Sequence, residues 1–233
     1  MESFLNLSWK VKIDSILIGS SRITIEEFPK DGDEETLITF LDVNASLTGL
    51  NNRITKNENH YALLKATGLL MGSAKTHAEF QLPLDSKSAY TAKGKVSKFH
   101  LAELNPVFIP VANIRIESGY LNSLTFNFRY TEFNSKGELD IDYENLKLLS
   151  LNKNNSRTHE LKTLFISFFI KKNRDQSGKH AKAVGIIDIE RDRKRFIFNI
   201  WWRSILDGLR STMLGHGKSN KDKKKQRSSE QNI

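Results

Sequence analysis

The chain of 233 residues contains no cysteine. Disulfide bonds, thiolate metal sites and cysteine nucleophiles are therefore excluded, and the compartment can be oxidising or reducing. Long apolar runs are missing as well, because the longest, LFISFFI at 164–170, is far shorter than the roughly 20 residues that a membrane-spanning helix needs. We expect no transmembrane helix here. The first residues, MESFLNLSWKVK, also lack the features of a secretory signal, so export would require a longer parent or a different start.

Sequence motifs of catalysis are also missing. The six histidines are scattered without metal-ligand spacing, and no nucleotide-binding glycine loop, GxSxG elbow or SxxK motif occurs. Four carboxylates alternate with apolar residues from Glu138 to Glu144, which is typical of the solvated face of a strand. We predict that the protein is not an enzyme and uses no metal or cofactor. A converging pair of carboxylates in a cleft would revive one alternative, an enzyme that acts on an envelope polysaccharide.

What the sequence does contain is strict alternation of apolar and polar residues, the period of a strand with one wet face. The alternation occurs at 7–13, 41–48, 74–82, 90–97, 124–130 and 138–144, with turn-forming residues between the segments. It predicts an antiparallel meander with one apolar face. Such a sheet must close on itself, pack against a second layer or line something hydrophobic, because a bare apolar face would be a large exposed patch.

The last third of the chain differs in pattern and in charge. Residues 1–155 hold 17 Lys and Arg against 19 Asp and Glu, a net charge of −2, whereas residues 156–233 hold 19 against 8, a net charge of +11. We expect a helix over 158–173, a strand over 183–191 and a second helix over 196–214. The chain then divides into a sheet or groove over 1–155, a helix-strand-helix cap of the same domain over 156–214, and a disordered basic tail over 215–233.

The second helix carries a broad apolar stripe and two adjacent tryptophans just after a basic cluster. One interpretation is docking to an anionic membrane surface or to a membrane protein. The residues that would dock are Arg193, Lys194, Arg195, Trp201, Trp202 and Arg203. The other interpretation, equally compatible with the pattern, is a helix that caps the sheet with Trp201 buried. The tail segment KDKKKQR at 221–227 contains no interleaved aromatic residues, so we expect no specific nucleic-acid partner.

The order of these parts resembles the C-terminal region of the AsmA-like superfamily, the TamB-related envelope proteins of Gram-negative bacteria, in the version common in Bacteroidetes. The stretches that carry the resemblance are IDSILIGSSRITIEEF (14–28), ITFLDVNASLTGL (38–50), YTAKGKVSKFHLAELNPVFIPVANIRIESGYLNSLTFNFRY (90–130), SKGELDIDYENLKLLSL (135–151) and IERDRKRFIFNIWWRSILDGLRSTM (189–213). The family's N-terminal membrane helix and most of its length have no counterpart here, so the resemblance suggests a truncated or split member, or one segment of an assembly.

The resemblance implies a long twisted sheet rolled into an open groove, whose apolar interior shields the acyl chains of phospholipid between the inner and outer membranes. It also implies a location in the periplasm or at an envelope membrane. The residues that would line the interior are Leu41, Val43, Ala45, Leu47, Phe80, Val96, Leu124, Phe126, Phe128, Tyr130, Leu139, Ile141 and Tyr143. We therefore predict a mainly β fold with two C-terminal helices that holds or conveys lipid. The alternative is a closed β domain that serves as an envelope assembly or interaction factor without lipid.

Overall fold

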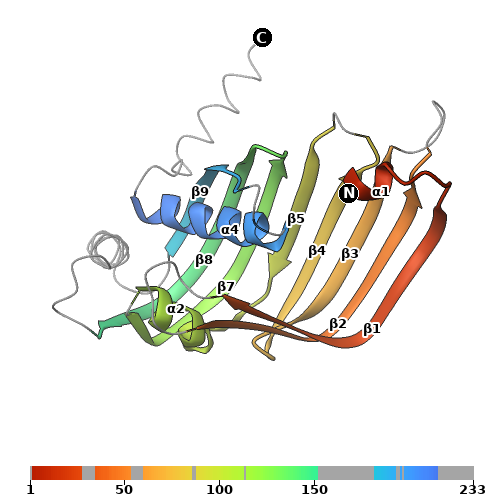
Figure 1. Ribbon diagram of the computed structural model, residues 1–233. Coiled ribbons are helices and arrows are strands. Elements are labelled where there is room, and N and C mark those ends of the chain that lie inside the picture. Colours follow the sequence, from red (N-terminus) through yellow and green to blue (C-terminus); the bar gives the residue numbers. More distant parts are fainter. Residues whose placement is uncertain are drawn as a thin grey trace, which may run out of the picture.

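The computed structural model describes residues 2–27, 35–53, 60–85, 88–112, 114–151, 181–192, 195 and 197–214. The strands in these residues form one nine-stranded antiparallel sheet, in the order β1-β2-β3-β4-β5-β7-β8-β9 with β6 paired to β7. The strands are β1 (Lys12–Glu27), β2 (Thr36–Asn51), β3 (Tyr61–Leu70), β4 (Ala74–Pro83), β5 (Tyr90–Val96), β6 (Phe99–His100), β7 (Ile114–Tyr130), β8 (Asn134–Ser150) and β9 (Ala181–Glu190). The helices are α1 (Glu2–Leu5), the 3₁₀ helix η1 (Leu101–Leu104), α2 (Asn105–Ala112) and α4 (Ile197–Leu214) (Figure 1).

The prediction of a mainly β, antiparallel and open sheet is confirmed, since β1 and β9 lie at opposite ends of the strand order. The C-terminal helix over 196–214 is also confirmed as α4. The helix expected over 158–173 and the tail over 215–233 lie outside the described residues. The strand expected over 7–13 is wrong for most of its length, because β1 begins only at Lys12. Just before it, the Asn52 side chain replaces the ladder: its Oδ1 accepts from Val11 N–H at 2.8 Å, and its Nδ2 donates to Trp9 O at 2.9 Å.

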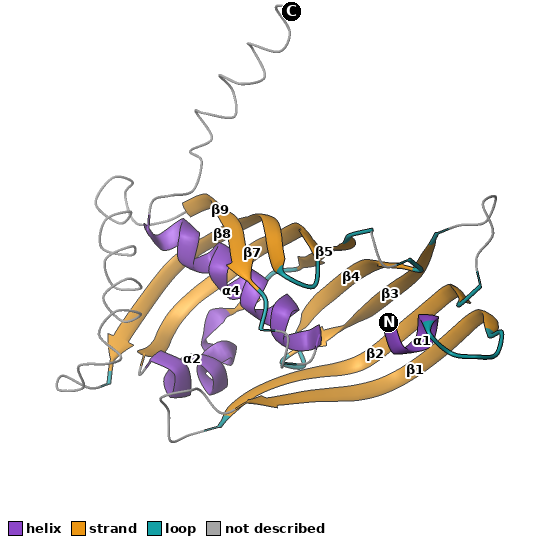
Figure 2. Cartoon of the chain, turned by 45° about the horizontal axis from the view of Figure 1, so that its top comes forward, coloured by secondary structure: helices purple, strands orange, loops and turns teal. Residues whose placement is uncertain are grey.

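Bulges bend the long outer strands partway along their length. Pairing between β1 and β2 shifts around Ser20 and Asp42, both of which have positive φ, and pairing between β7 and β8 shifts near Gly119 and Asn145. A bulge adds one residue to one strand and sharpens the local bend. Figures 1 and 2 show the ends of β1 and β2 curving under the sheet toward α2.

Helix α2 joins these bent ends, because it packs against both β2 and β7. Asn105 fixes it to β7 with two hydrogen bonds to the backbone of Ile116: its Oδ1 accepts from the N–H at 2.7 Å, and its Nδ2 donates to the carbonyl at 3.0 Å. Val107 of α2 and Ile38 of β2 are buried in this region. The sheet is thereby curved, with α2 beside its bent ends.

Helix α4 lies on the concave side of the sheet at its β9 end (Figures 1 and 2). Two glycines allow the helix to approach closely, since a Cβ atom added to Gly185 of β9 would stand 1.8 Å from the carbonyl oxygen of Gly208. Side chains of α4 also accept from the β9 backbone. Ile186 N–H donates to Ser211 Oγ at 3.0 Å, and Asp188 N–H donates to Asp207 Oδ2 at 2.9 Å. The helix thereby covers both the face and the edge of β9.

Candidate functional site

One face of the sheet, here called the inner face, is apolar along rows that cross the strands. Directly paired residues in an antiparallel sheet point to the same face, so the pairing register defines each row. In one row Leu47 pairs with Leu64, and Leu64 pairs with Phe80. In the adjacent row Ala45, Ala66, Ala78 and Gly94 follow one another from β2 to β5.

The small side chains of this second row, the alanine row, leave a strip of lower relief between larger neighbours, which we call the channel. Leu47, Leu64 and Phe80 form the row on one side. Val43 and Thr76, with Gly68 between them, form the row on the other side, and Phe40 and Leu70 lie one row further. The channel ends at β5, because the Phe126 ring occupies the space beside Gly94, 2.4 Å from where a Cβ atom would stand. From β2 to β5 it crosses three strand spacings, about 14 Å.

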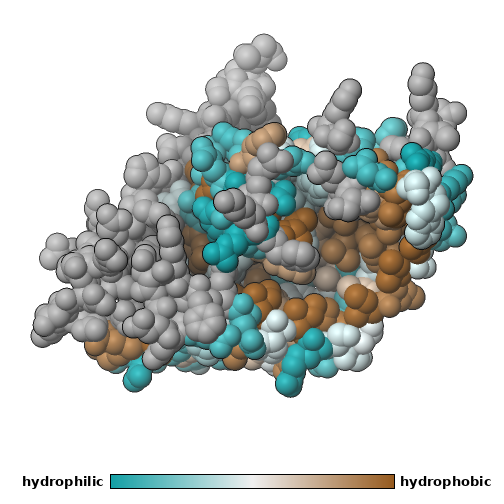
Figure 3. All heavy atoms as spheres, viewed as in Figure 1, coloured by the Kyte–Doolittle hydropathy of each residue, from teal (hydrophilic) through white to brown (hydrophobic). Residues whose placement is uncertain are grey.

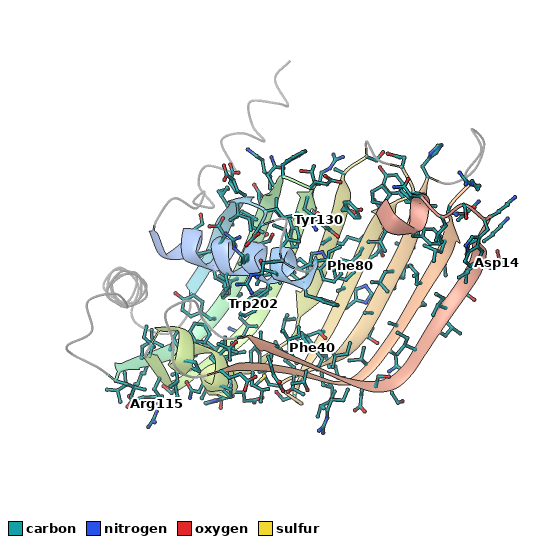
Figure 4. All side chains as sticks on the ribbon, in the orientation of Figure 1. Asp14, Phe40, Phe80, Arg115, Tyr130 and Trp202 are labelled. Carbon is teal, nitrogen blue, oxygen red and sulfur yellow. The ribbon has the colours of Figure 1, made fainter. Side chains whose placement is uncertain are left out.

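The inner face is covered at one end only. At the β7–β9 end, α4 buries Phe128 and Tyr130, which are 1% and 0% exposed. Trp201 of α4 stacks on Phe80 with 4.0 Å between ring centroids and meets the Tyr130 ring edge-on. Figure 4 shows Phe80 and Tyr130 beside α4. This half of the inner face is an ordinary packed core.

At the β1 end the same face is open. Ile16, Ile18 and Ile23 of β1 are 39%, 49% and 39% exposed, and Phe40 and Leu47 of β2 are half-buried. Register places all five on the inner face, because Ile16 pairs with Leu47 and Ile23 pairs with Phe40. Figure 3 shows the result as a hollowed hydrophobic surface over β1–β4. Here we call this open half the trough and its β1 end the mouth.

Toward β4–β9 the opposite, outer face of the sheet is polar and ion-paired, whereas at β1–β3 it also carries leucines such as Leu17 and Leu41. Lys93 Nζ lies 2.8 Å from Glu79 Oε1, and the hydrogen bond from Lys93 lowers the pKa of that carboxyl. Lys182 Nζ lies 3.3 Å from Asp142 Oδ2 in the same way. Such exposed pairs add little stability, but they keep this face in water. The sheet is therefore amphipathic at β4–β9, while at the β1 end its uncovered apolar residues include those inside the trough.

The residues predicted from sequence to line the interior divide between the two halves. Val43, Ala45 and Leu47 lie on the inner face of the open trough, although Val43 itself is only 6% exposed. The others lie on the inner face toward β4–β9, where most are buried or packed against the core. These are Phe80, Val96, Leu124, Phe126, Phe128, Tyr130, Leu139, Ile141 and Tyr143.

The placement predicted for Leu41 is wrong. Leu41 pairs with Leu69, whereas Phe40 pairs with Leu70, which packs against the core. The left-handed backbone of Asp42, with φ of +48°, inserts one extra residue and moves Leu41 to the outer face. Phe40 takes the inner position instead, as Figure 4 shows.

The residues predicted to dock to a membrane also separate. Trp201 packs against the core, which agrees with the second interpretation of the helix, in which it caps the sheet. Trp202 is half-buried, and Figure 4 places it on the side of α4 toward α2. Arg195 and Arg203 are exposed, and the Arg195 Nε lies 4.0 Å from Asp192 Oδ2. Arg193 and Lys194 lie outside the described residues.

The alternation of apolar and polar residues did not identify the isoleucines of β1 as part of the apolar face. Ile16 and Ile18 are two apart, but Ile23 follows five residues later because the bulge at Ser20 interrupts the period. A search for two alternating segments separated by one extra residue would have found them. The alternation also did not single out β3, whose Gly68 interrupts the apolar positions of the inner face at a point where Val43 fills the space.

Burial in the packed half raises the pKa of Tyr130 and of Tyr143, so both phenols are neutral at ordinary pH. The described residues hold no group of three His, Asp or Glu side chains placed to bind a metal ion. None of the described helices is long and apolar enough to cross a membrane. No protein-family model, curated protein or solved structure matches the chain.

Proposed function

We propose that the protein is a noncatalytic envelope protein that shields phospholipid acyl chains in the trough. The observation that carries the proposal is the unequal cover of one apolar face, which is packed under α4 at one end and exposed at the isoleucines of β1 at the other. Large exposed apolar surfaces on a folded chain are sites of interaction with protein, membrane or ligand. The resemblance to AsmA-like proteins supports lipid and an envelope location among these choices.

The dimensions of the alanine row support an acyl chain as the occupant. Its length of about 14 Å from β2 to β5 is close to the roughly 15 Å that one leaflet contributes to the hydrocarbon core of a bilayer. Small side chains at Ala45, Ala66 and Ala78 leave room for a slender apolar chain between bulkier rows. Each methylene transferred from water into such a channel contributes about 0.8 kcal/mol.

The test fills the channel without changing its polarity. Ala66→Phe places a ring in the middle of the alanine row, and we expect copurifying phospholipid, measured by mass spectrometry of the extracted protein, to fall at least about tenfold, which corresponds to about 1.4 kcal/mol. Delipidated native protein should regain lipid from phospholipid vesicles, and the Ala66→Phe variant should not.

Thr67→Phe is the matched control. It adds the same side chain at the next position of β3, which is exposed on the outer face. This variant should keep native lipid content. Equal lipid in both variants, or no lipid in the native protein before and after incubation with vesicles, would contradict the proposal.

The second candidate is an assembly or interaction factor without lipid. It is favoured by the packed half, where Phe80 and Tyr130 meet Trp201 rather than a channel. Native protein that purifies and remains free of lipid, with the trough covered by a captured protein, is the result expected for this function.

A further inference from the structure

The two ends of the sheet differ in how their backbone edges are protected. At β9, Ser211 and Asp207 of α4 accept from the backbone N–H groups of Ile186 and Asp188. At the other end, β1 has β2 as its one neighbour in the sheet formed by the described strands, over 16 residues. A long unprotected edge is a template on which another strand can form a ladder.

The side chains of β1 are also exposed on both faces of the sheet. Leu17, on the outer face, is 76% exposed, and Ile16 and Ile18, on the inner face, are 39% and 49% exposed. A strand added to this edge would cover apolar groups above and below the ladder. The occupant must therefore carry apolar residues on both of its faces near its centre, as β1 itself does.

The bulge at Ser20 makes β1 complementary to a second copy of itself. If two β1 strands pair antiparallel about a twofold axis between Gly19 and Ser20, Ile16 faces the second copy's Ile23 and Ile18 faces its Ser21. All four positions belong to the inner face in the register with β2. Without the extra residue this symmetric pairing would set inner residues against outer ones.

Charges on β1 are compatible with that register. On the outer face Leu17 lies opposite Arg22, so the aliphatic part of the arginine can cover the leucine. Asp14 lies opposite Ile25, and Glu26 lies opposite Ile13, so no like charges meet at these positions. Each pair recurs across the twofold axis, as in any isologous interface.

We propose that the chain forms a homodimer through antiparallel pairing of β1 with β1 of a second copy. The two sheets become one, and the two troughs join at their mouths into a single trough with α4 at each end. An interface of one strand pair is small, so we expect a Kd on the order of micromolar. The pairing rests on the geometry of β1 and does not depend on the proposed lipid function.

Charge exchange tests the register. Leu17→Lys sets a lysine opposite Arg22 of the other copy and should weaken dimerisation at least about tenfold in sedimentation equilibrium, whereas Leu17→Lys combined with Arg22→Glu should restore it through two Lys–Glu pairs. The matched control is Leu149→Lys on β8, another exposed leucine at 43%. It should leave the dimer unchanged.

The absence of cysteine gives a second test. Ser15 and Thr24 face each other across the proposed interface, so Ser15→Cys combined with Thr24→Cys should form an intermolecular disulfide on oxidation, and each single variant should not. Within one copy the two positions lie nine residues apart on a strand, beyond disulfide reach. A native chain that is monomeric at about 100 µM, well above a micromolar Kd, or a double-cysteine variant without crosslink, overturns the proposal. So does failure of the charge exchange to restore pairing, which would indicate a different partner strand.

Discussion

At the scale of single residues, the glycines under α4 decide how closely the helix approaches the sheet. Gly185→Ala would place a methyl group 1.8 Å from the carbonyl oxygen of Gly208 and 2.9 Å from Thr212 Cγ2. Because backbone cannot yield as a flexible side chain can, we expect a loss of about 3 kcal/mol in the free energy of unfolding. In thermal denaturation this corresponds to a fall in Tm of roughly 6–12 °C.

Gly19→Ala is the control for that prediction. The added methyl group at Gly19 would meet only Asn44 Oδ1 at 3.9 Å, an ordinary contact. In protein dilute enough to be monomeric, its Tm should therefore stay within about 2 °C of the native value. If both variants unfold at the same temperature, α4 does not lie against β9 as described.

Single residues are also where prediction from sequence failed. Alternation gave the correct face for Ala45 and Leu47, because they follow the bulge in β2, and the wrong face for Leu41, which precedes it. A one-residue insertion exchanges the two faces of a strand. Such a bulge cannot be recognised from the residue type when its left-handed position is Asp42 or Ser20 rather than glycine. The isoleucines of the mouth were missed for the same reason.

At the scale of elements, α4 acts as the cover of an edge strand. Asp207→Ala combined with Ser211→Ala removes both acceptors for the β9 backbone, and each lost hydrogen bond contributes about 1 kcal/mol. We therefore expect the free energy of unfolding in urea to fall by about 2 kcal/mol. The exposed β9 edge should also make the variant more prone to aggregate.

Arg203→Ala tests whether that loss is specific. Arg203 lies on the same helix but is exposed, so its removal should change the free energy of unfolding by less than about 0.5 kcal/mol. A double variant no less stable than Arg203→Ala would show that α4 contributes only through its apolar side.

The periodicity of the sequence predicted most elements because their partners are local. Hairpin neighbours such as β4 and β5 need only a short turn and one apolar face. Helix α2 was missed, since the two prolines in NPVFIPVA suggest a loop and its position depends on contacts with β2 and β7 from distant parts of the chain. The sequence also did not decide whether α4 covers the inner face or binds a membrane, because an amphipathic stripe fits a sheet and a membrane equally well.

At the scale of the whole molecule, the sheet has one protected end and one unprotected end. Hydrogen exchange should report this asymmetry: in dilute protein the edge amides of β1 exchange quickly, whereas Ile186 and Asp188 of β9, also an end strand, exchange slowly. Raising the protein concentration should slow exchange in β1 if the edges pair, and leave β9 unchanged. Equally fast exchange at both ends would contradict the cover described for α4.

The ring of Phe126 closes the alanine row at β5 and so sets the length of the row. On the proposed function, an acyl chain laid from β2 toward β5 would end at the ring of Phe126, and any additional length would extend past Ile18 at the other end. The affinity for acyl chains would then depend on their length, because the part that extends beyond the row stays exposed to water. Replacing Phe126 by a smaller side chain should shift the preference toward longer chains.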